Sequence, residues 1–538
     1  MEQFKKSKNK LLVIGIDGGT FDIILPMIHA GRLPNLGRLL SNGAYGTLLS
    51  TIPPVTAPAW SSFVMGSNPG QHGVFYFFRK EEKSDGAKSE RVLMNLRNIE
   101  GIPFWRVLNR YGNKVGLINI PLTYPPDKVD GFMISGMLVP PGANNYTYPP
   151  ELLSTLDKYY VDVDGLMKQG EWQGKKLIRG NREQFIKNVF QITSNRAHNA
   201  LTLMKKEPWD FFMVVFTGSD RVCHFFWEDR KTGKSPSSVI EDYYIHLDSI
   251  IGKLIDEAGD DTCKIIMSDH GFGPAPTKRI NAFTLAKDLG ETAFLPGHTF
   301  SYLKARLLGK IGIPKRIDPS DLIDVKNSRV FLEPMYANFL GVSINIKDGA
   351  ENGVATPGRE YQDLREKIIN HLKKLTDPVS GKCLVEKVYT RESLYHGKFA
   401  NNAPDIVVQF SYDIKLGFSP LKKALVRTAK DPIRTGDHRR EGILIASGRQ
   451  IRSGSLENEM FIQDVTPTML YLAGCPIPES YDGRVIKELF GDDYLLQRPP
   501  EYYDDSKNPE RSLPEERGFD SAKEYEQAKT LLENLGYM

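Results

Sequence analysis

Short runs of apolar, often β-branched residues recur along the chain, and each run ends in turn-forming or acidic residues. A continuous apolar run of this kind is typical of a parallel strand that is buried on both faces. The clearest runs lie in KLLVIGIDGGT (10–20), KVGLINIP (114–121), DFFMVVFTGSD (210–220) and CKIIMSDHGF (263–272). The sequence therefore predicts buried strands at these four places.

Helical segments lie between these strands. Examples are LPNLGRLLSNG (33–43) and GIPFWRVLNRYG (101–112), the second with proline just inside its start and glycine at its end. The alternation predicts an α/β fold, with a mostly parallel central sheet flanked by helices on both faces. Ligands of such sheets bind at the carboxyl ends of the strands, where Asp17, Asp220 and Asp269 are found.

The alternation loosens after about residue 275. The stretch 338–410 reads as strand, helix and strand with loops between, and the strand pattern of the core resumes at GILIASG (442–448). We therefore predict an inserted smaller lobe that shapes the substrate pocket. The expected parts are a catalytic core in two pieces (1–275 and 431–497), the inserted lobe (276–430) and a C-terminal tail (498–538).

Composition places the chain among soluble globular proteins. Its 538 residues are more than one hydrophobic core normally holds, and 40% hydrophobic with 25% charged residues is ordinary. The 70 basic and 66 acidic residues give a net charge of only +4. Because the basic residues are scattered, we expect no nucleic-acid binding. The one dense basic cluster, KKSKNK near the N-terminus, reads as a solvated leader.

The cysteines and the apolar runs bear on the compartment. Cys223, Cys263, Cys383 and Cys475 lie far apart with no CxxC motif, so neither a disulfide framework nor a cysteine zinc site is indicated. The first apolar run, LLVIGI (11–16), is far shorter than the about 18 residues of a membrane helix, and no cleavage site follows it. We predict a cytoplasmic protein without a transmembrane segment.

Six carboxylate and imidazole side chains in the strand-end motifs are competent to bind metal. Carboxylate oxygens and imidazole nitrogens together suit zinc or manganese. An aspartate and a histidine four residues apart face one centre from a single helical turn, and a neighbouring pair at a strand end can point into one cleft. Two ions would share the set, which consists of Asp17, Asp220, His224, Asp269, His270 and His438.

Each of these residues also has a purely structural interpretation. Asp17, before two glycines, can cap a helix or shape a turn, and Asp220 with His224 can be a pair on a helix surface. His438 can be an ordinary loop histidine. The Asp269–His270 pair is more specific, because burying a charge directly after an apolar strand requires a metal or an ion pair.

Six ordered motifs together resemble the alkaline phosphatase superfamily, and look most like its type I phosphodiesterase/nucleotide pyrophosphatase family. They are IDGGTFD, TAPAWSSFVMGSNPGQHGV, SDRVCHFF, SDHGF, GDHRREG and DVTPTMLYLAGCPIPESYDGR. The resemblance implies an alkaline-phosphatase-like fold with two divalent metal ions, zinc first and manganese as the alternative. It implies that Asp17, Thr56, Asp269 and His270 surround one ion and that Asp220, His224 and His438 hold the other.

Thr56 is the nucleophile that the resemblance implies. A threonine hydroxyl is a poor nucleophile at neutral pH, and a bound divalent cation makes its alkoxide available. Prolines at 53, 54 and 58 fix the surrounding turn, and the following helix begins with backbone N–H groups that can bind a phosphate. The structural alternative, that Thr56 caps this helix, is compatible with the catalytic role.

The expected activity is hydrolysis of phosphodiester or pyrophosphate bonds in small nucleotide or nucleotide-sugar substrates, through a phospho-threonine intermediate. Many family members have an asparagine about twenty residues after the nucleophile, where this chain has Phe77, so the diester preference is open; Tyr76 or Arg79 could substitute. The alternatives are a phosphomonoesterase or phosphomutase of the same superfamily, and a non-catalytic metal-binding module. TAPAW lacks the sulfatase nucleophile pattern.

Two further groups of residues have open roles. Arg221, Arg434 and Arg439 flank the metal-ligand candidates, and either bind a second charged group of the substrate or support the site from behind. His72 is interpreted as a structural hydrogen-bonding residue. The sequence does not indicate an oligomeric state.

Overall fold

The computed structural model describes residues 9–81, 90–163, 182–231, 238–310, 319–347, 353–428, 433–506 and 518–535. The chain divides into two compact units. The first comprises Met1–Pro274, Gly397–Phe399 and Ile433–Met538, and the second comprises Ala275–His396 and Ala400–Pro432. All residues predicted to bind metal belong to the first unit.

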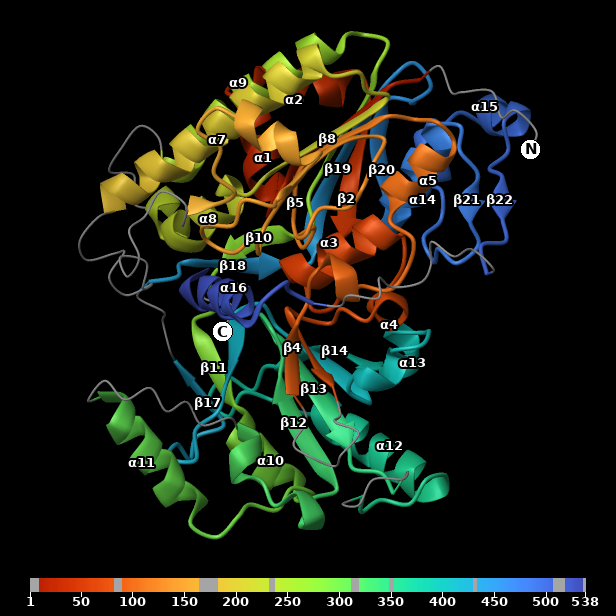
Figure 1. Cartoon of the computed structure of the whole chain (residues 1–538). Coiled ribbons are helices and arrows are strands. Elements are labelled where there is room, and N and C mark those ends of the chain that lie inside the picture. Colours follow the sequence, from red (N-terminus) through yellow and green to blue (C-terminus); the bar gives the residue numbers. More distant parts are fainter. Residues whose placement is uncertain are drawn as a thin grey trace. The chain divides into compact units, whose positions relative to one another are not determined.

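A nine-stranded sheet forms the centre of the first unit (Figure 1). In spatial order its strands are β20 (Gly454–Phe461), β2 (Ala44–Leu49), β19 (Glu441–Ser447), β9 (Cys263–Met267), β1 (Leu11–Ile16), β8 (Phe211–Phe216), β5 (Val115–Ile120), β6 (Gly131–Ser135) and β7 (Thr147–Tyr148). Five of the eight neighbouring pairs are parallel, and β19 and β7 run antiparallel to their neighbours. The predicted mostly parallel sheet is confirmed.

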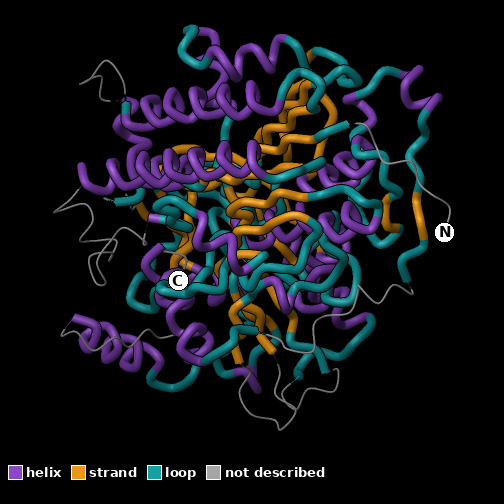
Figure 2. The backbone as a smooth tube through the Cα atoms, turned by 45° about the horizontal axis from the view of Figure 1, so that its top comes forward, coloured by secondary structure: helices purple, strands orange, loops and turns teal. Residues whose placement is uncertain are grey.

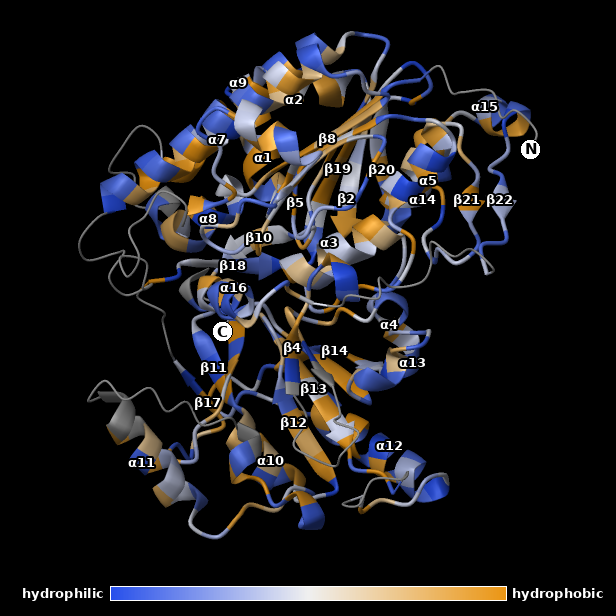
Figure 3. Ribbon diagram, viewed as in Figure 1, coloured by the Kyte–Doolittle hydropathy of each residue, from blue (hydrophilic) through white to orange (hydrophobic). Residues whose placement is uncertain are grey.

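The four predicted apolar runs are the central strands β1, β5, β8 and β9, and every residue in them is buried. Figure 1 shows helices on both sides of the sheet, which explains why neither face of these strands needs polar residues. Figure 3 shows apolar strands beneath helices that alternate polar and apolar residues. On one side lie α1 (Phe21–His29), α2 (Pro34–Ser41), α7 (Arg182–Lys206) and α9 (Val239–Ala258), and on the other α3 (Thr56–Met65), α5 (Phe104–Arg110) and α14 (Val465–Leu472).

Shorter elements complete the first unit. Two strands, β10 (Gly271–Pro274) and β18 (Gly436–Arg439), pair antiparallel although 161 residues of sequence separate their facing ends, Pro274 and Gly436. The others are α4 (Pro69–His72), α8 (Gly218–Phe226), α15 (Asp492–Gln497), α16 (Ala522–Leu535), the hairpin of β3 (Phe78–Glu81) with β4 (Glu90–Leu93), and the pair of β21 (Ile477–Pro478) with β22 (Tyr502–Tyr503). The stretch predicted as a C-terminal tail thus contributes a strand and a helix to this unit.

The second unit has its own sheets and core. An antiparallel sheet in the order β12 (Val330–Pro334), β13 (Phe339–Ile344), β15 (Ile406–Phe410) and β14 (Val385–Thr390) packs with α12 (Arg359–Lys373). A smaller sheet holds β16 (Ile414–Gly417), β11 (Lys278–Asn281) and β17 (Val426–Thr428). The other helices of this unit are α10 (Ala282–Leu289), α11 (His298–Lys310) and α13 (Arg391–Leu394).

Figure 2 shows strands and helices along most of the described chain. Among the described residues, no helix combines the length and apolarity that crossing a membrane requires.

Candidate metal and active site

Three neighbouring strands bring the three metal-competent aspartates to one edge of the large sheet. Asp17 directly follows β1, Asp220 lies in helix α8 after β8, and Asp269 follows β9 after one serine. Because β1 lies between β8 and β9 and is parallel to both, the three strand ends are adjacent. All six predicted ligands are buried, none with more than 2% of its surface exposed.

The first cluster consists of Asp220, His224 and His438. The Nε2 atom of His438 lies 3.1 Å from Oδ1 of Asp220 and 3.1 Å from Nε2 of His224. The Nε2 atom of His224 lies 3.4 Å from the same Asp220 oxygen. One carboxylate oxygen and two ring nitrogens therefore converge on one small volume.

The second cluster consists of Asp17, Asp269 and His270. The Nε2 atom of His270 lies 3.3 Å from Oδ2 of Asp269 and 3.6 Å from Oδ1 of Asp17. The other Asp269 oxygen accepts a hydrogen bond of 3.1 Å from the Gly18 backbone N–H. The rings of His270 and His438 stack with centroids 3.6 Å apart, so the two clusters lie side by side.

The backbone fixes which nitrogen of each histidine faces the clusters. The Nδ1 atoms of His224, His270 and His438 lie 3.3, 3.0 and 2.9 Å from the carbonyl oxygens of Gly436, Gly271 and Pro54. A neutral ring that donates its Nδ1–H to a carbonyl presents an Nε2 lone pair on its other side. This arrangement is the one that metal-binding histidines use.

Burial makes the clusters electrostatically costly without cations. It lowers the pKa of His270 to about 3 and the pKa of His224 well below its usual value. Burial, with the other carboxylates adding to it, raises the pKa of Asp269 to about 8 and raises that of Asp17 well above its usual range. Burial also acts to raise the pKa of Asp220, but the neighbouring His224 and Arg221 outweigh it and hold that pKa well below its usual value.

The donor atoms fit two divalent cations. Asp17 Oδ1, Asp269 Oδ2 and His270 Nε2 are buried without a hydrogen-bond partner, a rare and expensive condition for polar atoms. Ligands about 2 Å from a tetrahedral zinc ion lie about 3.3 Å from one another. The measured separations of 3.1–3.6 Å match this value. Oxygen and imidazole donors suit zinc or manganese.

Thr56 is the first residue of α3, with 1% of its surface exposed. The carbonyl of Pro54, two residues earlier, accepts the Nδ1–H hydrogen bond of His438, so the loop before Thr56 is tied directly to the first cluster. The positive end of the helix dipole lies at this residue, where an anionic group is favoured.

Sequence reasoning left the role of Arg221 open, and the structure shows that it supports the site from behind. Its Nη1 atom donates a 2.6 Å hydrogen bond to Oδ2 of Asp220, while Nη2 donates one of 2.8 Å to Asp162. All three side chains are almost fully buried. Arg439 likewise donates to the backbone carbonyls of His438 and Pro274. Asp162 had no signal in the sequence, because its role depends only on this contact.

Phe77, at the position where many family members have an asparagine, is fully buried. Tyr76 packs edge-on against it with ring centroids 5.6 Å apart, and the guanidinium of Arg79 lies over the ring of Phe399. These contacts agree with a packing role for the aromatic residues of this segment. Position 77 therefore carries no amide group.

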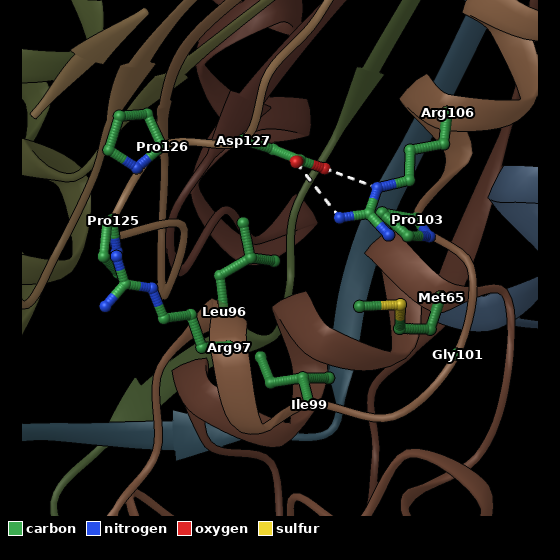
Figure 4. Close-up of a pocket in the computed structure, with 10 residues that line it drawn as sticks. All are labelled: Met65, Leu96, Arg97, Ile99, Gly101, Pro103, Arg106, Pro125, Pro126 and Asp127. Atoms are coloured by element: carbon green, nitrogen blue, oxygen red, sulfur yellow. Dashed lines mark hydrogen bonds and ion pairs between the residues drawn. The ribbon is translucent and has the colours of Figure 1, made fainter. Parts of the chain in front are cut away.

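A pocket of about 100 Å³ lies elsewhere in the first unit (Figure 4). Its wall includes Met65, the last residue of α3, about 13 Å along the helix from Thr56. Its charged side chains have partners, since Arg106 pairs with Asp127 and Arg97 with Asp520. The pocket is therefore separate from the two clusters, and nothing in it marks a reacting group.

Comparison with known proteins finds one matching family and several solved structures with a similar fold. Residues 11–438 match the model of the family described as type I phosphodiesterase/nucleotide pyrophosphatase. No curated protein matched the chain. Among solved structures, human ectonucleotide pyrophosphatase/phosphodiesterase 5 aligns with TM-score 0.52 and 14% identity over 90% of this chain and 100% of its own. Phosphonoacetate hydrolase from Sinorhizobium meliloti aligns with TM-score 0.51 and 16% identity over 88% and 97%. At such identities the likeness shows a common fold.

His72 provides a pH test of the packing beneath α3. Its Nδ1 accepts a hydrogen bond from the Val74 N–H, and its Nε2 lies 2.8 Å from the Ser62 hydroxyl, so the buried ring is neutral. Burial lowers its pKa to about 3. Since the unfolded chain takes up this proton near pH 6.5, wild-type stability falls as the pH drops from 6.5 towards 3.

We therefore expect the stability advantage of wild type over His72→Gln to shrink below pH 6, by about 1.4 kcal/mol per pH unit. Urea unfolding followed by circular dichroism at pH 7, 6, 5 and 4 measures this difference. Ser62→Ala keeps the titrating ring, so its difference from wild type should stay nearly constant. A His72→Gln difference that is also constant with pH would contradict the prediction.

Proposed function

The chain belongs to the type I phosphodiesterase/nucleotide pyrophosphatase family, and from this premise we propose that it is a two-metal hydrolase that cleaves phosphodiester or pyrophosphate bonds. Nucleotides and nucleotide sugars are the proposed substrates. Asp17, Thr56, Asp269 and His270 would hold one divalent cation, and Asp220, His224 and His438 the other. The observation that carries the proposal is the convergence of buried carboxylate oxygens and imidazole nitrogens in two groups that share His270, namely Asp220, His270 and His438, and Asp17, Asp269 and His270. His224 joins the first group through its contacts with Asp220 and His438.

Thr56 is the proposed nucleophile. When bound, two divalent cations lower the pKa of a hydroxyl and neutralise charge on a phosphoryl group. The Thr56 hydroxyl loses its proton and its oxygen attacks phosphorus, the bond to the leaving oxygen breaks, and the leaving group departs as a phosphate or takes up a proton and departs as an alcohol. Water then attacks the phospho-threonine, the bond between phosphorus and the Thr56 oxygen breaks, and the threonine hydroxyl is restored. The N-terminus of α3 stabilises the negative charge throughout.

A phosphomonoesterase of the same superfamily is the second candidate. The fully buried Phe77 leaves no amide where many family members contact a phosphoryl oxygen, which removes one feature associated with nucleotide diesters.

The mouse ectonucleotide pyrophosphatase/phosphodiesterase 5, aligned at 13% identity, was solved as an inactive variant with AMP. That ligand makes nucleotides the first substrates to test here.

A cytoplasmic location remains our proposal. All four cysteines are free thiols, and three of them are buried. Burial raises the pKa of Cys263 and of Cys475 to about 12, so these thiols stay protonated and unreactive at neutral pH. Free thiols of this kind suit a reducing compartment.

Replacing the nucleophile tests the reaction scheme. Thr56→Ala should lower kcat/KM at least about 1,000-fold, because removing a nucleophile that acts with its activating groups abolishes most of the rate enhancement. Hydrolysis of p-nitrophenyl phosphate, bis-p-nitrophenyl phosphate and a nucleoside phosphodiester measures both the loss and the preferred ester class. Thr51→Ala is the matched control, because its hydroxyl only donates to the Pro53 carbonyl in the same loop. Full activity of Thr56→Ala would exclude the scheme.

Removal of metal tests the cofactor assignment. We expect the purified protein to carry two zinc or manganese ions per chain, measured by elemental analysis. Dialysis against a chelator should abolish activity and lower the melting temperature, since buried carboxylates and lone pairs lose the charge that offsets their burial. Added zinc or manganese should restore both. A chelated protein that keeps its turnover would refute the metal requirement, and one that binds two ions without hydrolysing any ester would support the non-catalytic alternative.

Arg221 should tune metal affinity without touching substrate. Arg221→Gln removes the cation that orients Asp220 and leaves the Asp162 carboxylate buried without it, so we expect about 10- to 100-fold weaker binding of one ion. Competition with a chromogenic chelator measures the affinity of each ion. Arg106→Gln is the control, because Arg106 also pairs with a carboxylate, that of Asp127, but lies at the separate pocket. Equal effects of the two substitutions would mean that Arg221 acts only through general stability.

A further inference from the structure

Among the described side chains of helix α11, those that pack against the second unit lie on one face. Ala305 is buried, and the Tyr302 hydroxyl donates a long, 3.5 Å hydrogen bond to the Phe418 carbonyl. The ring of His298 lies 5.5 Å from the rings of both Phe283 and Phe294, centroid to centroid. Positions 298, 302 and 305 follow the helical repeat, so they define the face that anchors α11 to its own unit.

The opposite face carries large apolar side chains in solvent. Phe300 is 71% exposed, Leu303 39% and Leu307 61%, and their spacing of three and four residues places them on one face. Leu295, just before the helix, is 40% exposed. Four of the nine exposed large apolar side chains in the described chain thus fall within 13 residues. Single exposed leucines need no explanation, but such a concentration marks an interaction surface.

The lysine and arginine residues of helix α11 are not balanced by acidic residues. Its sequence, HTFSYLKARLLGK, contains two lysines and one arginine and no acidic residue, and residues 292–297 before it contain no acidic residue either. The chain as a whole has nearly equal numbers, 70 basic and 66 acidic. Lys304 is exposed and follows Phe300 by four residues, so a positive charge borders the apolar face.

An exposed apolar face bordered by a basic side chain, on a helix without acidic residues, is the pattern of helices that lie in the surface of an anionic bilayer. We propose that α11 is a peripheral membrane-binding helix, which inserts Phe300, Leu303 and Leu307 between the lipids while Lys304 contacts anionic headgroups. A second copy of the chain fits the face less well, because pairing α11 with itself would bring together two helices that carry only positive charges. The inference does not depend on the proposed reaction.

Vesicle sedimentation with the full chain tests the proposal. Wild type should pellet with vesicles of equal parts phosphatidylcholine and phosphatidylglycerol at 100 mM salt, and stay in solution with phosphatidylcholine alone. Phe300→Ser/Leu303→Ser/Leu307→Ser should weaken binding at least tenfold. Lys304→Gln should weaken it about fivefold, as expected for one lysine near an anionic surface. Raising the salt to 500 mM should weaken wild-type binding further.

Two exposed apolar residues away from α11 provide matched controls. Val379 is 96% exposed in the same unit and Leu496 is 80% exposed in the first unit, so Val379→Ser and Leu496→Ser should bind vesicles within twofold of wild type. Circular dichroism and the melting temperature of the triple variant verify its folding, and the single Phe300→Ser and Leu307→Ser variants replace it if it fails to fold.

Three results would overturn the proposal. The first is wild-type protein that stays in solution with anionic vesicles. The second is binding that the α11 substitutions leave unchanged or that the control substitutions reduce equally. The third is a wild-type dimer, detected by size exclusion with light scattering, that the triple variant converts to a monomer, because a second copy would then cover this face.

Discussion

The first unit buries a cluster of aspartate and histidine side chains beside the ends of three adjacent strands. Three carboxylates and three imidazoles with lone pairs facing inward lie within a few ångströms of one another, and almost none of their surface is exposed. Burying such a cluster is costly unless positive charge enters it, because no hydrogen-bond donor of the described chain meets Asp17 Oδ1, Asp269 Oδ2 or His270 Nε2. Under the proposed function two divalent cations supply that charge, and the same cost that burial imposes makes their binding tight.

The backbone holds this cluster more than the side chains do. Each histidine is oriented by a peptide carbonyl, and the Gly18 N–H orients Asp269. His438 enters through the pairing of β18 with β10, whose register sets it opposite Phe272, two residues after His270. Most of the chain between Pro274 and Ile433 belongs to the second unit, and this strand pair links the two segments of the first unit that flank it. A long insertion is therefore tolerated without moving His438 relative to His270.

The sequence allowed prediction of the parts of the fold that depend on local pattern. The central strands β1, β5, β8 and β9 are continuous apolar runs, and the acidic residues that follow β1, β8 and β9 identify the edge where the candidate site lies. The antiparallel placement of β19 between β2 and β9 follows from tertiary packing that no local pattern encodes. The role of Arg221 could not be settled either, because it depends on Asp162, 59 residues earlier in the chain. The apolar face of α11 became visible only when the packed face was known.

The buried candidate site and the loops around it have different parts in substrate choice. Under the proposed function, the reacting groups of the first unit lie at strand ends and at the start of α3, where the surrounding side chains are buried. Phe77 is packed in the core and offers no polar group to a phosphoryl oxygen. Under the proposed function, the N-terminus of α3 and the bound cations would therefore meet the phosphoryl charge. Groups of this kind would bind a phosphoryl centre in an ester or an anhydride alike. Discrimination between a monoester and a nucleotide diester must therefore come from contacts to the leaving group, which the loops outside this cluster provide.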